Sequence, residues 1–192
     1  MAMPDLLHRW TRQEVLALPD DGNRYELIDG ELLVSPSPRG LHQRAIASLF
    51  RRVDPYVRAH RVGVTLFSPA DLMFEGDQVV QPDLFVVPLM ENGREPRDWP
   101  EMGIPLLIAE VLSRSTEWDD KFTKRVKFQR SGVGHYWIVD VDARTFEDWR
   151  DSDLEPRIVA DRIEWWPAGA GTPFAIDVPA YFREVWGEES AG

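Results

Sequence analysis

The stretch that most constrains the fold is the apolar run from Leu106 to Leu112, because it contains a carboxylate, Glu110. Such a run is typical of a strand buried on both faces, as in sheets that helices cover. An ionised carboxylate is costly to bury there unless it meets a cation, shares a proton or lines a polar cleft. The run therefore predicts an α/β fold with a functional acid in its central sheet.

A second apolar run starts at Pro82-Asp83 and raises the same question. Pro82 fixes its own φ and pushes Gln81 into extended geometry, so the pair is well suited to begin a strand. Two carboxylates on neighbouring strands can hold a hard divalent cation such as Mg²⁺, which prefers oxygen ligands and keeps several waters. Asp83 and Glu110 are therefore candidate ligands of Mg²⁺, with Mn²⁺ as a substitute.

Four segments of the sequence form an ordered set, namely Arg24–Leu32, Gln81–Asp83, Glu110–Leu112 and Gly132–Asp140. Together they resemble the Uma-two family of restriction-endonuclease-like proteins, which belongs to the PD-(D/E)XK nuclease superfamily. The resemblance covers roughly residues 11 to 185. It implies a metal-dependent endonuclease in which Asp83 and Glu110 are catalytic.

The lysine of the superfamily motif is displaced in this chain. It would stand two residues after Glu110, where the sequence has Leu112. In the family it lies on the following helix, and the resemblance maps it to Lys124. Because Lys124 would act after the metal has bound, Lys124→Ala is expected to keep the fold and the metal affinity and to lose hydrolysis.

The helix that carries Lys124 has two candidate buried stripes. Asp120, Lys124 and Phe128 are spaced i, i+4, i+8 and share one face, so Asp120 could orient Lys124 or form an ordinary surface ion pair with it. The other stripe, Trp118, Phe122 and Val126, has the composition of a core. The sequence leaves open which of the two faces the sheet.

Three further residues are candidates for the site. The family resemblance makes Glu26 a fourth catalytic residue, in a hairpin predicted around Asp29-Gly30; the alternative is an edge-strand glutamate facing water. His42 lies in the first turn of a predicted helix that Pro55 is expected to kink or end. It is a supporting candidate, as is Gln81; the alternative for His42 is an ordinary surface histidine at a helix start.

The charge distribution bears on the substrate. The net charge of -11 is unfavourable for a nucleic-acid enzyme, because Lys and Arg contacts to phosphate supply most non-specific affinity. The segment from Arg39 to Arg61, however, contains six arginines and a single acid, Asp54. This segment predicts phosphate contacts, while a solvated helix face remains the alternative; the residues expected to bind nucleic acid are Arg39, Arg44, Arg51 and Arg52.

Composition narrows the remaining choices. With 192 residues and 43% hydrophobic residues, we expect one domain over residues 1–186 and a disordered tail over residues 187–192. The absence of cysteine excludes disulfides, thiolate zinc sites and cysteine nucleophiles. The sequence has no signal peptide, no membrane-length apolar run, and no serine-hydrolase, zincin or phosphate-loop motif, so we expect a cytoplasmic protein.

These patterns predict a restriction-endonuclease-like fold, in which helices flank a mixed central sheet. The expected function is Mg²⁺-dependent hydrolysis of phosphodiester bonds in a nucleic acid, most plausibly DNA, with a homodimer left open. The alternative is a catalytically silent nuclease-fold module for binding or assembly. The net negative charge and Leu112 favour the alternative, whereas the order of Asp83, Glu110 and Lys124 favours the enzyme.

Overall fold

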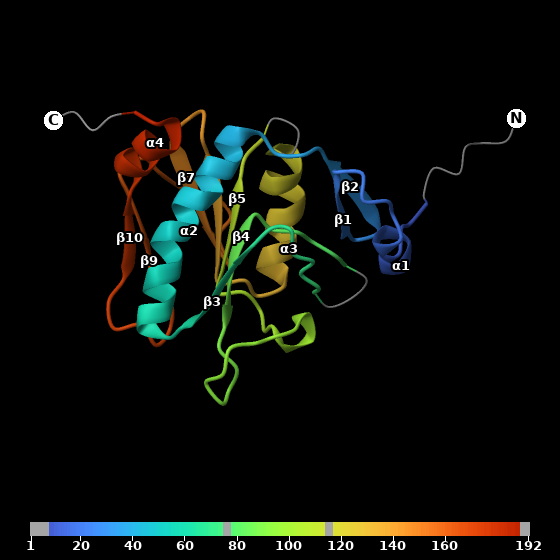
Figure 1. The fold of residues 1–192 in the computed structure, drawn as a ribbon, viewed down its shortest axis with the longest axis horizontal. Helices are drawn as coiled ribbons and strands as arrows, with labels where there is room; N and C mark the ends of the chain where they lie inside the picture. The colour runs from blue at the N-terminus through green and yellow to red at the C-terminus, as the bar shows by residue number, and fades with distance from the viewer. Residues whose placement is uncertain (1–7, 75–77, 114–116, 189–192) are drawn as a thin grey trace, which may run out of the picture.

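A mixed six-stranded sheet forms the centre of the molecule, as seen in a computed structural model that describes residues 8–74, 78–113 and 117–188 (Figure 1). Its strand order is β3-β4-β5-β6-β7-β8, in which β5 and β6 are parallel and the other neighbours antiparallel. The strands are β3 (Gly63–Phe67), β4 (Leu84–Pro88), β5 (Leu107–Val111), β6 (His135–Asp140), β7 (Thr145–Arg150) and β8 (Arg157–Val159). The predicted mixed sheet with flanking helices is confirmed.

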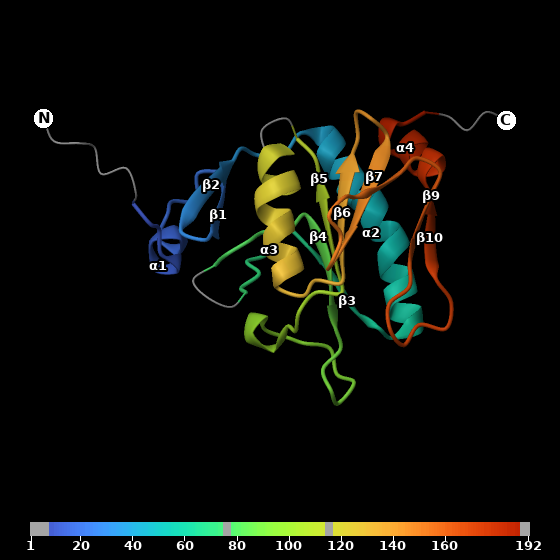
Figure 2. The same cartoon turned by 180° about the vertical axis from the view of Figure 1, so that it is seen from behind.

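Helices cover both faces of this sheet. The long helix α2 (Gly40–His60) lies on one face, and a π-helical turn, η2 (Asp119–Lys124), continues as α3 (Arg125–Arg130) on the other (Figures 1 and 2). The α2 side is completed by α4 (Val178–Trp186) and the hairpin of β9 (Arg162–Trp165) and β10 (Phe174–Asp177). The remaining elements are α1 (Arg12–Leu16), β1 (Arg24–Ile28), β2 (Glu31–Ser35) and η1 (Trp99–Glu101).

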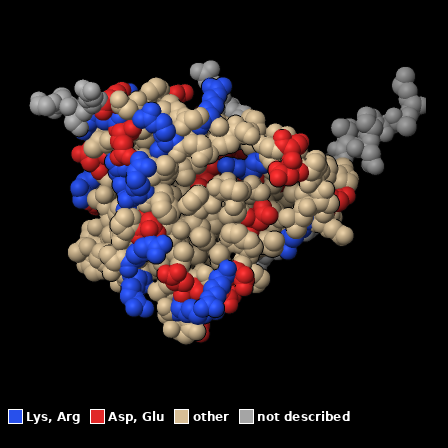
Figure 3. All heavy atoms as spheres, viewed as in Figure 1, with Lys and Arg blue, Asp and Glu red and all other residues tan. Residues whose placement is uncertain are grey.

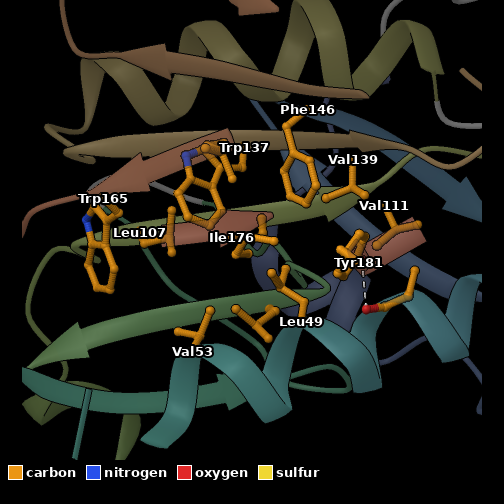
Figure 4. Close-up of a cluster of buried hydrophobic side chains, with 14 of the residues drawn as sticks. Leu49, Val53, Leu107, Val111, Trp137, Val139, Phe146, Trp165, Ile176 and Tyr181 are labelled. Atoms are coloured by element: carbon orange, nitrogen blue, oxygen red, sulfur yellow. Dashed lines mark hydrogen bonds between the residues drawn. The ribbon is translucent and has the colours of Figure 1, made fainter. Parts of the chain in front are cut away.

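The core follows from the alternation of side chains along the strands. In β4, Leu84 and Val86 pack on the α2 side, while Phe85 and Val87 pack on the α3 side. Every residue of β5 is buried, as expected for a strand covered on both faces. Figure 4 shows the α2 side of the core, with the side chains of α2 facing those of the sheet; those labelled include Leu49, Val53, Leu107, Trp137, Val139 and Phe146.

Local sequence signals are mostly confirmed. The predicted hairpin turn has positive φ at Asp29 (50°) and Gly30 (86°), as a two-residue turn joining β1 and β2 requires. The proline at position 55, in contrast, does not end its helix, because α2 continues to His60. Val53 and Val57 are both buried against the sheet on either side of Pro55. Their packing offsets the cost of about 3 kcal/mol that a proline brings to a helix interior.

The end of the described chain is held in place by contacts. Gly187 closes α4 with φ of 71°, and Glu188 accepts hydrogen bonds from the Arg144 guanidinium. Gly187 and Glu188 are the first two residues of the predicted tail, and the rest of it, residues 189–192, lies outside the described part. No helix in the described residues is long and apolar enough to cross a membrane.

The topology brings four chain segments together at one edge of the sheet, by which we mean the end where β4 begins and β5 ends. Because β4 and β5 are antiparallel, the start of β4 lies beside the end of β5. The first turn of α2 and the π-helical turn η2 reach the same edge, next to the β1–β2 hairpin (Figure 1). This edge is where the predicted site residues would have to meet.

Candidate active site

The two predicted metal ligands meet at this edge. Asp83 directly precedes β4 and Glu110 lies in β5, with exposed fractions of 2% and 1%. They are linked through the backbone: the Asp83 amide donates to Glu110 Oε2 (3.2 Å), and the Val111 amide donates to Asp83 Oδ2 (2.8 Å). The acids are therefore fixed relative to each other by the pairing of their own strands.

Lys124 gathers three carboxylates around a buried ammonium. Its Nζ lies 2.8 Å from Glu26 Oε2, 3.0 Å from Asp120 Oδ1 and 3.2 Å from Glu110 Oε1. All four of these residues are buried. The structure thus brings Glu26 and Asp120 together at Lys124, and neither acid faces water; their part in catalysis stays a prediction.

The helix that carries Lys124 turns one of its two candidate stripes toward the sheet. Asp120, Lys124 and Phe128 are buried, whereas Trp118 and Phe122 are 69% and 48% exposed and Val126 is half-buried. Residues four apart lie on the same helix face, so Asp120 and Lys124 meet on the inner face. The segment around them, Asp119–Lys124, is a π-helical turn. Single π-helical turns are frequent at functional sites.

Two further side chains, those of Arg24 and His42, contact the carboxylate of Asp83. Arg24 Nη2 lies 2.7 Å from Asp83 Oδ1, and Arg24 Nη1 lies 4.0 Å from Glu110 Oε2. His42 Nε2 lies 3.0 Å from Asp83 Oδ2, so the structure places His42 beside Asp83, and its supporting role stays a prediction. Arg24 was not among the predicted site residues. Its place two residues before Glu26 in a strand puts both on the same face of β1, which is a signal that sequence reasoning could have used.

Gln81 supports the site through its backbone. Its amide N–H donates to Glu26 Oε1 at 2.8 Å, and its side chain donates to Asp71 Oδ1 at 2.7 Å. Tyr136 contributes from β6, because its hydroxyl donates to the Asp120 carbonyl at 3.0 Å. These bonds hold β1 and the π-helical turn against the strands that carry the acids.

The environments of the two acids push their pKa values apart. Burial works to raise the pKa of Asp83, but the hydrogen bond from His42 and the charge of Arg24 outweigh it and leave that pKa below its usual value. Burial raises the pKa of Glu110 well above its usual value, because the neighbouring carboxylates add to it and Lys124 only partly offsets it. Burial lowers the pKa of Lys124, yet the three surrounding acids raise it overall, so its ammonium stays charged.

The charge balance of the cluster fits a divalent cation. Four buried carboxylates face two permanent cations, so two negative charges are in excess when all four acids are ionised; the acids are Glu26, Asp83, Glu110 and Asp120, and the cations are Arg24 and Lys124. Among the described residues, no group of three or more His, Cys, Asp or Glu side chains could hold a metal ion. The candidate metal site therefore offers two protein carboxylates, Asp83 and Glu110, and water would supply the remaining ligands. Such an arrangement is common for Mg²⁺.

The arginines predicted to bind nucleic acid lie along α2. Arg39 is the residue before its first turn. Arg51 and Arg52 form ion pairs with Glu184 of α4, and Arg44 donates to the Glu184 carbonyl at 3.0 Å. Where α2 meets α4, blue and red atoms alternate on the surface in Figure 3. Contact of these arginines with phosphate stays a prediction.

The sheet, its flanking helices and the acids at its edge define a restriction-endonuclease-like nuclease fold. The family model Uma2, described as "Putative restriction endonuclease", matches residues 12–178, and the chain belongs to that family. The fold is similar to the crystal structure of a protein from Anabaena variabilis ATCC 29413, described as a putative nuclease belonging to DUF820. That similarity has a TM-score of 0.73 at 21% identity and covers 92% of this chain and 99% of the other. No curated protein matches the chain.

Proposed function

We propose that this protein is a Mg²⁺-dependent endonuclease that hydrolyses phosphodiester bonds in DNA. The observation that carries the proposal is the convergence of Asp83, Glu110 and Lys124 at one buried edge of a nuclease fold. Membership of a family described as restriction endonucleases supports the nuclease class. Magnesium and DNA are the finer parts of the proposal, and they rest on the oxygen ligands and on the arginines of α2.

Each residue of the cluster has a role in this proposal. Asp83 and Glu110 would hold the divalent ion, which when bound lowers the pKa of a coordinated water and neutralises phosphate charge. His42 and the Val111 amide keep Asp83 oriented. Lys124 holds Glu110 through Oε1 and is the candidate cation that stabilises negative charge developing on the scissile phosphate.

The proposal is tested by metal binding and cleavage measured side by side. Calorimetry should detect binding of Mg²⁺ or Mn²⁺ by the wild type, and the heat should disappear in Asp83→Asn and Glu110→Gln. The same variants should no longer cleave duplex, single-stranded or branched DNA. Glu164→Gln is the matched control, because Glu164 is an exposed acid paired with Arg162, and it should bind and cleave like the wild type.

One observation favours the alternative of a silent binding module. The guanidinium of Arg24 already lies beside the carboxylates of Asp83 and Glu110 and neutralises part of their charge. In that case the wild type would bind no divalent ion and would cleave none of the DNA substrates. Metal binding that persists in both acid variants would place the site elsewhere in the molecule.

A further inference from the structure

The guanidinium of Arg24 occupies the space in front of both acids. Its two terminal nitrogens face different carboxylates, Nη2 at 2.7 Å from Asp83 Oδ1 and Nη1 at 4.0 Å from Glu110 Oε2. The other oxygens of these acids have partners too: Asp83 Oδ2 accepts from the Val111 amide, and Glu110 Oε1 accepts from Lys124. Glu110 Oε2 also accepts from the Asp83 amide. Arg24 is therefore the cation that lies against both acids proposed to hold the divalent ion.

Arg24 and Lys124 differ in how easily they can leave. The Lys124 side chain is 2% exposed and contacts three carboxylates, whereas the Arg24 side chain is 16% exposed. Figure 3 shows charged atoms at the bottom of a recess between the start of α2 and the β1–β2 hairpin. The Arg24 side chain is therefore the more exposed of the two and has the greater freedom to turn away from the acids.

We propose that Arg24 is an internal substitute for the divalent cation: it neutralises Asp83 and Glu110 in the metal-free protein, turns away when the metal binds, and then contacts the phosphate of the substrate. This inference rests on the proposed metal-dependent function and names a residue that the function did not include. It gives Arg24 two successive partners, first a carboxylate pair and then a phosphate.

The chemistry of the guanidinium supports this exchange. Arginine does not lose its proton in proteins, so its positive charge can leave the acids only if the side chain moves. A guanidinium and a divalent ion repel each other, and both cannot occupy the same space between two carboxylates. The planar fork that pairs with a carboxylate also matches two phosphate oxygens. A short rotation out of the pair would therefore exchange one anionic partner for another.

The test compares metal affinity with hydrolysis in Arg24→Met. Since the substitution removes a competing cation, Mn²⁺ should bind without DNA at least about tenfold more tightly than in the wild type, as measured by calorimetry. Cleavage of duplex DNA at saturating Mn²⁺ should fall by about a hundredfold or more, because a cation at the phosphate is lost. Arg24→Lys keeps the charge, so its Mn²⁺ affinity should stay close to that of the wild type.

A surface variant and a folding measurement complete the experiment. Arg162→Met removes an exposed arginine paired with Glu164 and should change neither the affinity nor the rate. If Arg24→Met unfolds without metal, Mn²⁺ should refold it, since binding to the native state raises its stability. A folded Arg24→Met that binds Mn²⁺ no more tightly than the wild type, or an unfolded one that Mn²⁺ does not refold, overturns the role of Arg24. A wild type that binds no divalent ion overturns the proposed function itself.

Discussion

Two of the clusters in which arginine or lysine meets an acid differ sharply in burial. In the candidate site, Lys124 and Glu110 are both 1% exposed. On the surface between α2 and α4, the side chains of Arg51 and Glu184 are 60% and 39% exposed. The same ion-pair chemistry therefore operates in two very different solvent environments.

This difference decides what each cluster can do. Removing one partner of a buried pair leaves an uncompensated charge and is strongly destabilising, whereas an exposed pair contributes about 0 to 1 kcal/mol. The buried cluster is therefore a fixed arrangement in which each charge depends on the others. The surface cluster is more easily exchanged, because Arg51 could leave Glu184 for a phosphate at little cost, while Arg52 is also held by Ser48.

The largest effect is expected for Lys124→Met. The substitution leaves three buried carboxylates without their shared ammonium, so the free energy of unfolding should fall by about 3 to 5 kcal/mol. Urea denaturation at neutral pH measures this loss, with Lys127→Met as the control on the same helix. The result would also correct the sequence-based expectation that removal of the lysine spares the fold. An unfolding midpoint equal to that of the wild type would contradict the central role of Lys124.

A smaller effect is expected for His42→Ala, which removes one of the donors to Asp83 Oδ2. The Val111 amide remains in place, so the fold should be retained. Affinity for Mn²⁺ should fall by about tenfold, a usual loss when a group that orients a metal ligand is removed. His42→Gln can still present an amide N–H and should recover part of the affinity. Equal affinities in His42→Ala and the wild type would show that Asp83 needs no such support.

In the surface cluster, Glu184→Gln should barely change stability and should strengthen DNA binding. Stability should change by less than about 1 kcal/mol. The freed Arg51 and Arg52 should bind DNA more tightly, and the dependence of log affinity on log salt should steepen by about one to two. Fluorescence anisotropy at several salt concentrations measures both quantities. In a background of Arg51→Ala and Arg52→Ala the gain should vanish; a gain that persists there would remove these arginines from the DNA interface.

The smallest expected effect is a loss of stability at low pH. The hydrogen bond from Arg52 lowers the pKa of Glu184 from 4.5 to about 2, against a smaller opposing effect of burial. A depressed pKa stabilises the fold above the unfolded value, and this contribution is lost as the pH falls from about 4.5 toward 2. Because the side chain is partly exposed, the loss should be slight. Thermal melting across this range should show it in the wild type and not in Glu184→Gln.

The sequence predicted those parts of the site that have a local signal. Pro82-Asp83 and the apolar run around Glu110 identified the acids, and Asp29-Gly30 identified the turn that places Glu26. The burial of Lys124 was left open, because the competing stripe of Trp118, Phe122 and Val126 is the more apolar one and hydrophobicity alone would have placed it inward. The partner of Arg51 was equally hidden, since Glu184 lies 133 residues further along the chain.

The backbone bonds between Asp83 and Glu110 have a consequence for folding. Both faces of β4 and β5 are buried, so a one-residue slip would exchange the side chains that pack on the α2 side with those on the α3 side. A shift would break the bonds from the Asp83 amide to Glu110 and from the Val111 amide to Asp83, leaving buried polar groups without partners. The bonds between the two acids and the backbone therefore add to the stability of the strand alignment in which the site is formed.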